Sequence, residues 1–172
     1  MAAAWLQSNP KAASSFSAAG NLSSVPKANW VMPKCAKRVR SAGVLRWGGD
    51  VQGGAPYVYE DPDHAGRNKG FEVDLANALA RVLGVRAEFV QNDWSALVPS
   101  LERGTFDVVL NGLEVTPSRA ARLRLSRPYY AFAARLMARR DDPRVRADLA
   151  ALQGLRVGTL RTSYSEDLLR GR

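Results

Sequence analysis

Residues 111–119, NGLEVTPSR, place an arginine where a small anion could bind. The apolar run at residues 106–110 (FDVVL) predicts a buried strand, after which a short glycine-containing turn follows. Thr116 is a suitable N-cap and Pro117 suits the first helical position, so the sequence predicts a helix with Arg119 in its first turn. Unpaired backbone N–H groups beside a guanidinium can bind a carboxylate or a phosphate. The same residues are also typical of an ordinary strand-to-helix connection with a solvated arginine.

Two further candidate positions follow the ends of predicted strands. Asp50 comes after the short strand predicted at residues 43–48, and ligands of open α/β sheets bind at the carboxyl ends of the strands. Trp94 lies in the first turn of the helix predicted at residues 93–104, where it either packs inward or lines a pocket. The alternative for the glycine-rich residues around Asp50 is a long flexible loop.

The residue types exclude several kinds of site. Cys35 is the only cysteine and His64 the only histidine among the 172 residues. An internal disulfide, a cysteine-based metal cluster and a histidine-rich metal site are therefore impossible within this sequence. We expect no metal, no cofactor and no catalytic residues.

The net charge of +9 is concentrated near the beginning of the sequence. Residues 1–49 contain seven lysines and arginines and no acid, whereas the remaining residues contain 18 basic and 16 acidic side chains. The basic segment is rich in Ala, Ser, Asn and Pro, so we expect residues 1–40 to be disordered and do not expect a nucleic-acid partner. It lacks the continuous apolar stretch of a secretory signal, and no apolar run approaches the ~20 residues of a membrane span.

Hydrophobic periodicity predicts alternating strands and helices in the remaining residues. Residues 70–84 form the clearest helix, with one apolar face and a terminal glycine, and residues 85–90 alternate as a strand. Apolar runs predict further strands at residues 131–138 and 155–160, and another helix begins near residues 162–165. The order β-α-β-α-β-α predicts an α/β sheet that is covered by helices.

Four segments, in order and at similar spacing, resemble the bacterial extracellular solute-binding proteins of family 3, the polar amino-acid receptors of ABC transporters. They are GFEVDLANALARVLG, the block from DW to FDVV, NGLEVTPSR with the following SRPYY, and GLRVGTLRTSYSEDLL. The resemblance implies an α/β, periplasmic-binding-protein-like fold in which two lobes, joined by hinge strands, close over a ligand. It places lobe one at residues 41–133 and the hinge with the start of lobe two at residues 134–172, so that lobe two is incomplete.

Several site residues are implied by the resemblance. Arg119 aligns with the arginine that pairs with the α-carboxylate of the ligand, and Gly112 and Thr116 line the same subsite. Asp50 corresponds to an aspartate that faces the ligand side chain. Trp94 corresponds to an aromatic residue on the cleft wall.

Three more positions complete the expected ligand-binding set. Ser163 and Tyr164 fall where lobe two supplies backbone donors. Glu114 stands where the family usually has Ser or Thr. A glutamate cannot donate a hydrogen bond to a carboxylate but could accept one from an α-ammonium, so its role is open.

The implied function is that of the substrate-binding component of an ABC transporter, with a polar amino acid or a similar small carboxylate as ligand and a permease as partner. The implied location is periplasmic or extracellular. One alternative is a dehydratase of the cyclohexadienyl dehydratase type on the same fold. Turnover of a prephenate-like acid that is abolished by Glu114→Gln would favour this alternative. The other alternative is a truncated fragment without independent function.

Overall fold

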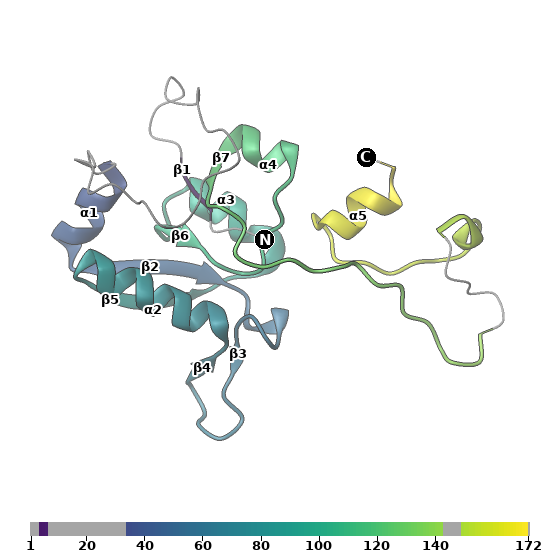
Figure 1. Ribbon diagram of the computed structural model, residues 1–172, viewed down its shortest axis with the longest axis horizontal. Helices are drawn as coiled ribbons and strands as arrows, with labels where there is room; N and C mark the ends of the chain where they lie inside the picture. Colours follow the sequence, from purple (N-terminus) through teal and green to yellow (C-terminus); the bar gives the residue numbers. More distant parts are fainter. Residues whose placement is uncertain (1–3, 7–33, 143–148, 172) are drawn as a thin grey trace, which may run out of the picture.

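The computed structural model describes residues 4–6, 34–142 and 149–171, and its main feature is a five-stranded sheet with helices on both faces (Figure 1). The elements, in chain order, are β1 (Ala4–Leu6), α1 (Lys34–Ala42), β2 (Val44–Gly49), the 3-10 helix η2 (Val51–Gly53), β3 (Tyr59–Glu60), β4 (Asn68–Lys69), α2 (Phe71–Leu83), β5 (Arg86–Gln91), the 3-10 helix η3 (Trp94–Ala96), α3 (Leu97–Glu102), β6 (Val108–Val109), α4 (Pro117–Arg122), β7 (Leu123–Leu125), the 3-10 helix η4 (Leu149–Leu152) and α5 (Tyr164–Leu169).

The strands of the sheet follow the order β5-β2-β6-β1-β7. Strand β2 runs parallel to both of its neighbours, with Trp47 opposite Phe89 of β5 and Val108 of β6. The predicted α/β sheet is therefore confirmed. Because parallel strands end at the same edge, the residues that follow β2, β5 and β6 are brought together there.

Alternation along the strands divides the core into two clusters. Leu45 and Trp47 of β2 face α1 and α2, together with buried residues such as Ala76. Leu97 of α3 packs on the other face of the sheet against Phe106. The Phe106 ring also requires a glycine at residue 48, since a Cβ there would lie 2.5 Å from the ring.

The strand β1 comes from the beginning of the sequence and lies between β6 and β7, antiparallel to both (Figure 1). Ala4 pairs with Val109 on one side and with Leu125 on the other, and its side chain is fully buried in the second core cluster. The disordered segment that we expected at residues 1–40 thus includes an ordered strand, and helix α1 begins at Lys34. Residues 1–3 and 7–33 lie outside the described part.

Most of the helices and strands agree with the sequence patterns. Helix α2 ends as predicted, with Gly84 in the left-handed conformation at φ 71°, and α4 begins with Thr116 as N-cap and Pro117 in its first turn. The strands predicted at residues 131–138 and 155–160 are wrong, because neither segment forms regular structure. Within the described residues these apolar runs have no neighbouring strand to complete their backbone hydrogen bonds.

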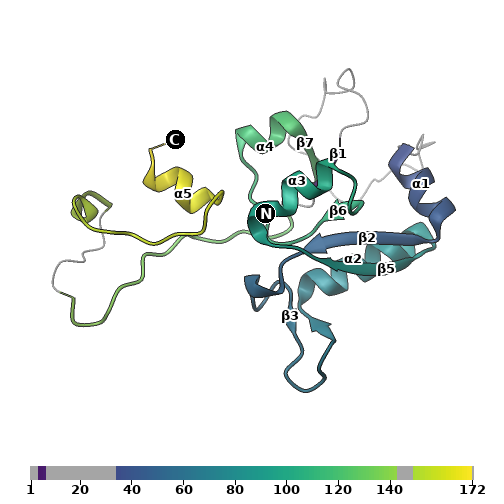
Figure 2. The same ribbon diagram turned by 180° about the vertical axis from the view of Figure 1, so that it is seen from behind.

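After β7 the chain leaves the sheet as an extended arm, and the last helix, α5, lies on the same side of the molecule as α4 (Figures 1 and 2). Hydrogen bonds join Thr162 and Tyr164, at the start of α5, to Arg119 of α4 and to Glu114 in the loop before α4. In the described part, no helix is both long and apolar enough to cross a membrane.

The position of β1 predicts the effect of a charge at Ala4. Ala4→Asp would bury an unpaired carboxylate between β6 and β7, so we expect the free energy of unfolding to fall by about 2 kcal/mol or more, measured by urea denaturation. Ala65→Asp in an exposed loop is the matched control and should change it by less than ~0.5 kcal/mol. Equal stability of the two variants would contradict the insertion of β1 in the sheet.

Candidate functional site

Asp50 and Asn111 connect the ends of β2 and β6 at the carboxyl edge of the sheet. The Asp50 amide donates to Oδ1 of Asn111 at 2.8 Å. The Asp50 carboxylate is almost buried and accepts hydrogen bonds from the Gln52 and Trp94 amides at 3.0 Å each and from the Gln91 side chain at 3.2 Å. Both carboxylate oxygens of Asp50 are therefore hydrogen-bonded, and they hold together the segments that contain Gln52, Gln91 and Trp94.

Glu72 holds the turn that leads into the 111–119 loop, a role that the sequence did not indicate. Its side chain is fully buried, and its Oε1 accepts hydrogen bonds from the Gly112 amide at 2.7 Å and the Tyr129 hydroxyl at 2.5 Å. Gly112 has φ 62°, a conformation that favours glycine. The sequence could not reveal this role, because nothing in the neighbouring residues distinguishes a buried glutamate from an exposed one.

The burial of Glu72 alters its proton affinity and that of Tyr129. Removal from water raises the pKa of the Glu72 carboxyl, although the hydrogen bonds from Tyr129 and Gly112 lower it in part. Burial, followed by the nearby Glu72 charge, raises the pKa of the Tyr129 hydroxyl. The Oε2 atom of Glu72 has no hydrogen-bond partner in the described part of the chain, so the charged form gains little compensation there.

Helix α4 places Arg119 over the face of Trp94. The Thr116 hydroxyl accepts a hydrogen bond from the Arg119 amide at 3.3 Å, as the N-cap pattern predicts. The guanidinium carbon lies 5.6 Å from the centroid of the Trp94 ring, within the range of a cation–π interaction. Arg119 therefore packs on Trp94, whereas the sequence also allowed a solvent-exposed arginine at this position.

Arg119 also makes a close ion pair with Glu114. The Nη1 atom of Arg119 lies 2.6 Å from Oε2 of Glu114 and 3.0 Å from the Glu114 carbonyl oxygen. The side chains of both residues are only 12% exposed. The other terminal nitrogen, Nη2, donates to the Thr162 carbonyl at 2.6 Å, and the Tyr164 amide donates to Oε1 of Glu114 at 3.3 Å. This cluster links the 111–119 loop to the segment before α5.

A cavity of about 320 Å³ opens beside this cluster. Its lining combines an aromatic ring, apolar side chains, hydroxyls and charges of both signs from η3, α3, α4 and the start of α5. The lining residues are Trp94, Ser95, Val98, Pro99, Leu113, Thr116, Ser118, Arg119, Arg122, Leu123, Thr162, Glu166 and Asp167. The volume is in the range of small-molecule sites.

The eight residues expected at the ligand site fall into two groups. Trp94, Thr116 and Arg119 line the cavity, Glu114 accepts a hydrogen bond from Arg119, and the Tyr164 amide donates to Glu114. The other three are Asp50, Gly112 and Ser163, which hold the chain in place: the Asp50 carboxylate accepts from the Trp94 amide, the Gly112 amide donates to Glu72, and the Ser163 hydroxyl accepts from the Glu166 amide as the N-cap of α5. The sequence did not single out Thr162, which has a positive φ of 61° and whose carbonyl binds the guanidinium.

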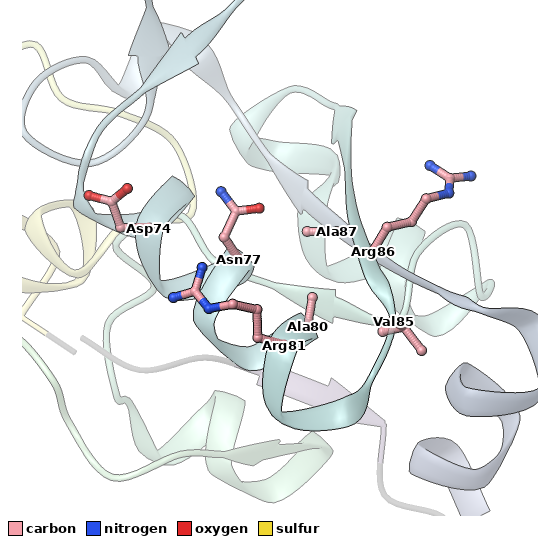
Figure 3. A pocket seen from close by; sticks show the side chains of 7 residues that line it. All are labelled: Asp74, Asn77, Ala80, Arg81, Val85, Arg86 and Ala87. Carbon is pink, nitrogen blue, oxygen red and sulfur yellow. The ribbon is translucent and has the colours of Figure 1, made fainter.

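A second, larger depression of about 520 Å³ lies between α2 and the start of β5 (Figure 3). Asp74, Asn77 and Arg81 project from α2 along it, and the side chain of Arg86 points away from these three (Figure 3). It shares no residue with the cavity beside Arg119 and has no aromatic residue in its lining. The convergence of Arg119, Trp94 and Glu114 therefore marks the smaller cavity as the candidate site.

Comparisons with known proteins agree with the fold and with this arrangement of segments. The sequence profile of the bacterial extracellular solute-binding proteins, family 3, matches residues 45–168. The chain is 32% identical over 99 residues to the ABC transporter arginine-binding protein 1 of Escherichia coli K12. That alignment covers 57% of this chain and 41% of the relative. It is 32% identical over 108 residues to the lysine/arginine/ornithine-binding periplasmic protein of the same organism. That alignment covers 63% of this chain and 41% of the relative.

Among solved structures, a variant of the arginine-bound form of domain 1 from TmArgBP, a T. maritima protein, matches with a TM-score of 0.52 and 34% identity. The match covers 55% of this chain and 71% of that chain. The periplasmic-binding-protein fold expected from the sequence is thus confirmed, with one lobe only partly represented. The chain spans about two fifths of the length of the curated relatives that it matches.

The burial of Glu72 predicts a pH-dependent stability. Because the pKa of Glu72 is raised in the folded state, the unfolded chain loses this proton first as the pH rises above the ordinary value of 4.5. The contribution of Glu72 to the free energy of unfolding is therefore largest below that pH and declines as the pH rises through the folded-state pKa. Glu72→Gln keeps an oxygen acceptor for Gly112 and Tyr129 but does not titrate.

We expect urea denaturation between pH 4 and pH 8 to show that the wild type loses stability relative to Glu72→Gln as the pH rises. Asp74→Asn, two residues along the same helix and exposed, is the control and should show no such trend. A constant difference between wild type and Glu72→Gln, or one that moves the other way, would refute the raised pKa.

Proposed function

The chain belongs to the bacterial extracellular solute-binding proteins, family 3, and we propose that it binds a polar amino acid or a similar small carboxylate in the cavity beside Arg119. One observation carries this proposal. A largely buried guanidinium lies over an aromatic face at the wall of a cavity large enough for such a ligand.

Arg119 is the group that we assign to the ligand carboxylate. Its planar guanidinium can form two parallel hydrogen bonds to a carboxylate, and the low exposure of the site strengthens such a charge-assisted pair. The hydroxyls of Thr116 and Ser118 lie 3.0 Å apart beside it and supply further polar contacts at the cavity wall.

Trp94 and Asp50 take different roles in this proposal. The Trp94 ring forms an apolar wall on which a ligand side chain can pack. Asp50 positions that wall, because its carboxylate accepts the hydrogen bond from the Trp94 amide through one oxygen and holds Gln52 and Gln91 through the other. Selection of the ligand side chain therefore falls to the cavity lining, where Asp167 adds a carboxylate.

The names of the relatives support the ligand class and its biological setting. They include an ABC transporter arginine-binding protein and a periplasmic lysine/arginine/ornithine-binding protein. We infer that this chain, as part of a two-lobed receptor, delivers an amino acid to an ABC transporter permease from a periplasmic or extracellular location.

Binding without turnover fits the described residues better than the dehydratase alternative. The acid nearest to the carboxylate subsite is Glu114, and both of its carboxylate oxygens are engaged, one by Arg119 and one by the Tyr164 amide. A general acid or base must reach the reacting proton, and in this structure both Glu114 oxygens are held by other groups of the chain. We therefore propose a receptor and not an enzyme.

Removal of Arg119 tests the proposal directly. We expect calorimetric titration of the chain with L-arginine, L-lysine and L-histidine to identify a ligand, and Arg119→Ala to weaken its binding by more than ~2 kcal/mol, about 30-fold, because the ligand carboxylate loses its buried partner.

Arg81→Ala is the charge-matched control, since Arg81 is exposed on α2 outside the candidate cavity. It should leave the affinity within about twofold. Equal affinity of wild type and Arg119→Ala, or no amino-acid binding by the wild type, would overturn the assignment.

A further inference from the structure

The Glu114 carboxylate makes the contacts that a bound anion would make. One of its oxygens lies 2.6 Å from Nη1 of Arg119, and the other accepts the hydrogen bond of the Tyr164 amide. Groups of the chain thereby use three of the five N–H donors of the guanidinium, since Nη1 makes two bonds to Glu114 and Nη2 donates to the Thr162 carbonyl. A ligand carboxylate that binds Nη1 of Arg119 and the Tyr164 amide must displace the Glu114 side chain.

From this geometry we propose that Glu114 is an exchangeable internal ligand of the carboxylate subsite, which competes with the external ligand for Arg119 and the Tyr164 amide. This inference rests on the proposed function of the same cavity. It makes Glu114 a specificity-determining residue. The sequence had left the role of Glu114 open.

The exchange sets the chemical class of the ligand. When a carboxylate displaces Glu114, the released side chain is left without its cation in a place where both partners are only 12% exposed, which is unfavourable. A zwitterion with an ammonium next to its carboxylate replaces both halves of the Arg119–Glu114 ion pair at once. A simple carboxylic acid replaces only one, so Glu114 favours α-amino acids over simple acids.

A second arginine of α4 forms an ion pair that is more exposed to water. Arg122 forms a close pair with Glu102, with nitrogen–oxygen distances of 2.6 and 2.8 Å. The side chains of Arg122 and Glu102 are 60% and 33% exposed, so water screens this pair. Glu102 therefore provides a control in which removal of a glutamate partner leaves a solvated arginine.

The experiment is a chemical rescue with acetate. Glu114→Ala leaves a space between Arg119 and the Tyr164 amide that acetate fits. We expect 50 mM sodium acetate to raise the Tm of Glu114→Ala by at least ~2 °C relative to sodium chloride at the same pH and ionic strength. Wild type, Glu102→Ala and the double variant Glu114→Ala/Arg119→Ala should show no such difference.

Hydrogen exchange gives a local readout that does not depend on global stability. The Tyr164 amide should exchange several-fold faster in Glu114→Ala than in the wild type, because it loses its acceptor, and acetate should slow it again. Absence of both the thermal and the exchange rescue would overturn the inference, as would an equal response in Glu102→Ala.

The two proposals fail separately. Acetate rescue without amino-acid binding by the wild type would support the carboxylate subsite and refute the receptor function. Amino-acid binding that depends on Arg119, combined with no acetate rescue, would keep the receptor function and refute the internal ligand. In Glu114→Gln, which keeps the shape without the charge, acetate should rescue less than in Glu114→Ala because no space is vacated.

Discussion

Buried hydrogen bonds at the carboxyl edge of the parallel strands hold the loops on which the candidate site depends. The Glu72 carboxylate binds the Gly112 amide, Asn111 binds the Asp50 amide, and Asp50 binds the Trp94 amide. Each bond satisfies a backbone donor that would otherwise lie unpaired in the interior at a cost of about 1–3 kcal/mol. These bonds fix the start of the 111–119 loop relative to Trp94, and the arginine that follows is thereby brought over the ring.

The ion pair between Arg119 and Glu114 couples this edge to the last described segment of the chain. Both side chains are largely withdrawn from water, so their attraction offsets a desolvation cost that an exposed pair would not bear. The Thr162 carbonyl and the Tyr164 amide complete the pair from a part of the sequence more than forty residues away. The contacts that stabilise this connection are also those that we propose for an anionic ligand, so in that proposal the ligand and Glu114 compete for one site.

Local sequence signals predicted the elements whose causes are local. Helix α2 follows from its apolar periodicity and its terminal glycine, and α4 from the cap at Thr116. The apolar runs at residues 131–138 and 155–160 look like strands, but a strand exists only when another supplies hydrogen bonds, which a single segment cannot reveal. For the same reason, the polar and basic surroundings of Ala4–Leu6 gave no sign that this segment would complete the sheet.

By itself, the sequence determined the α/β class and the helix that Thr116 caps, and it singled out Arg119 and Trp94 as candidates for a ligand site. Only the tertiary structure decided that Glu72 is buried under the loop, that the Asp50 carboxylate accepts a hydrogen bond from the Trp94 amide, and that Glu114 forms an ion pair with Arg119. The reason is physical, since the partner of a charged side chain depends on distances between segments that chain order does not specify.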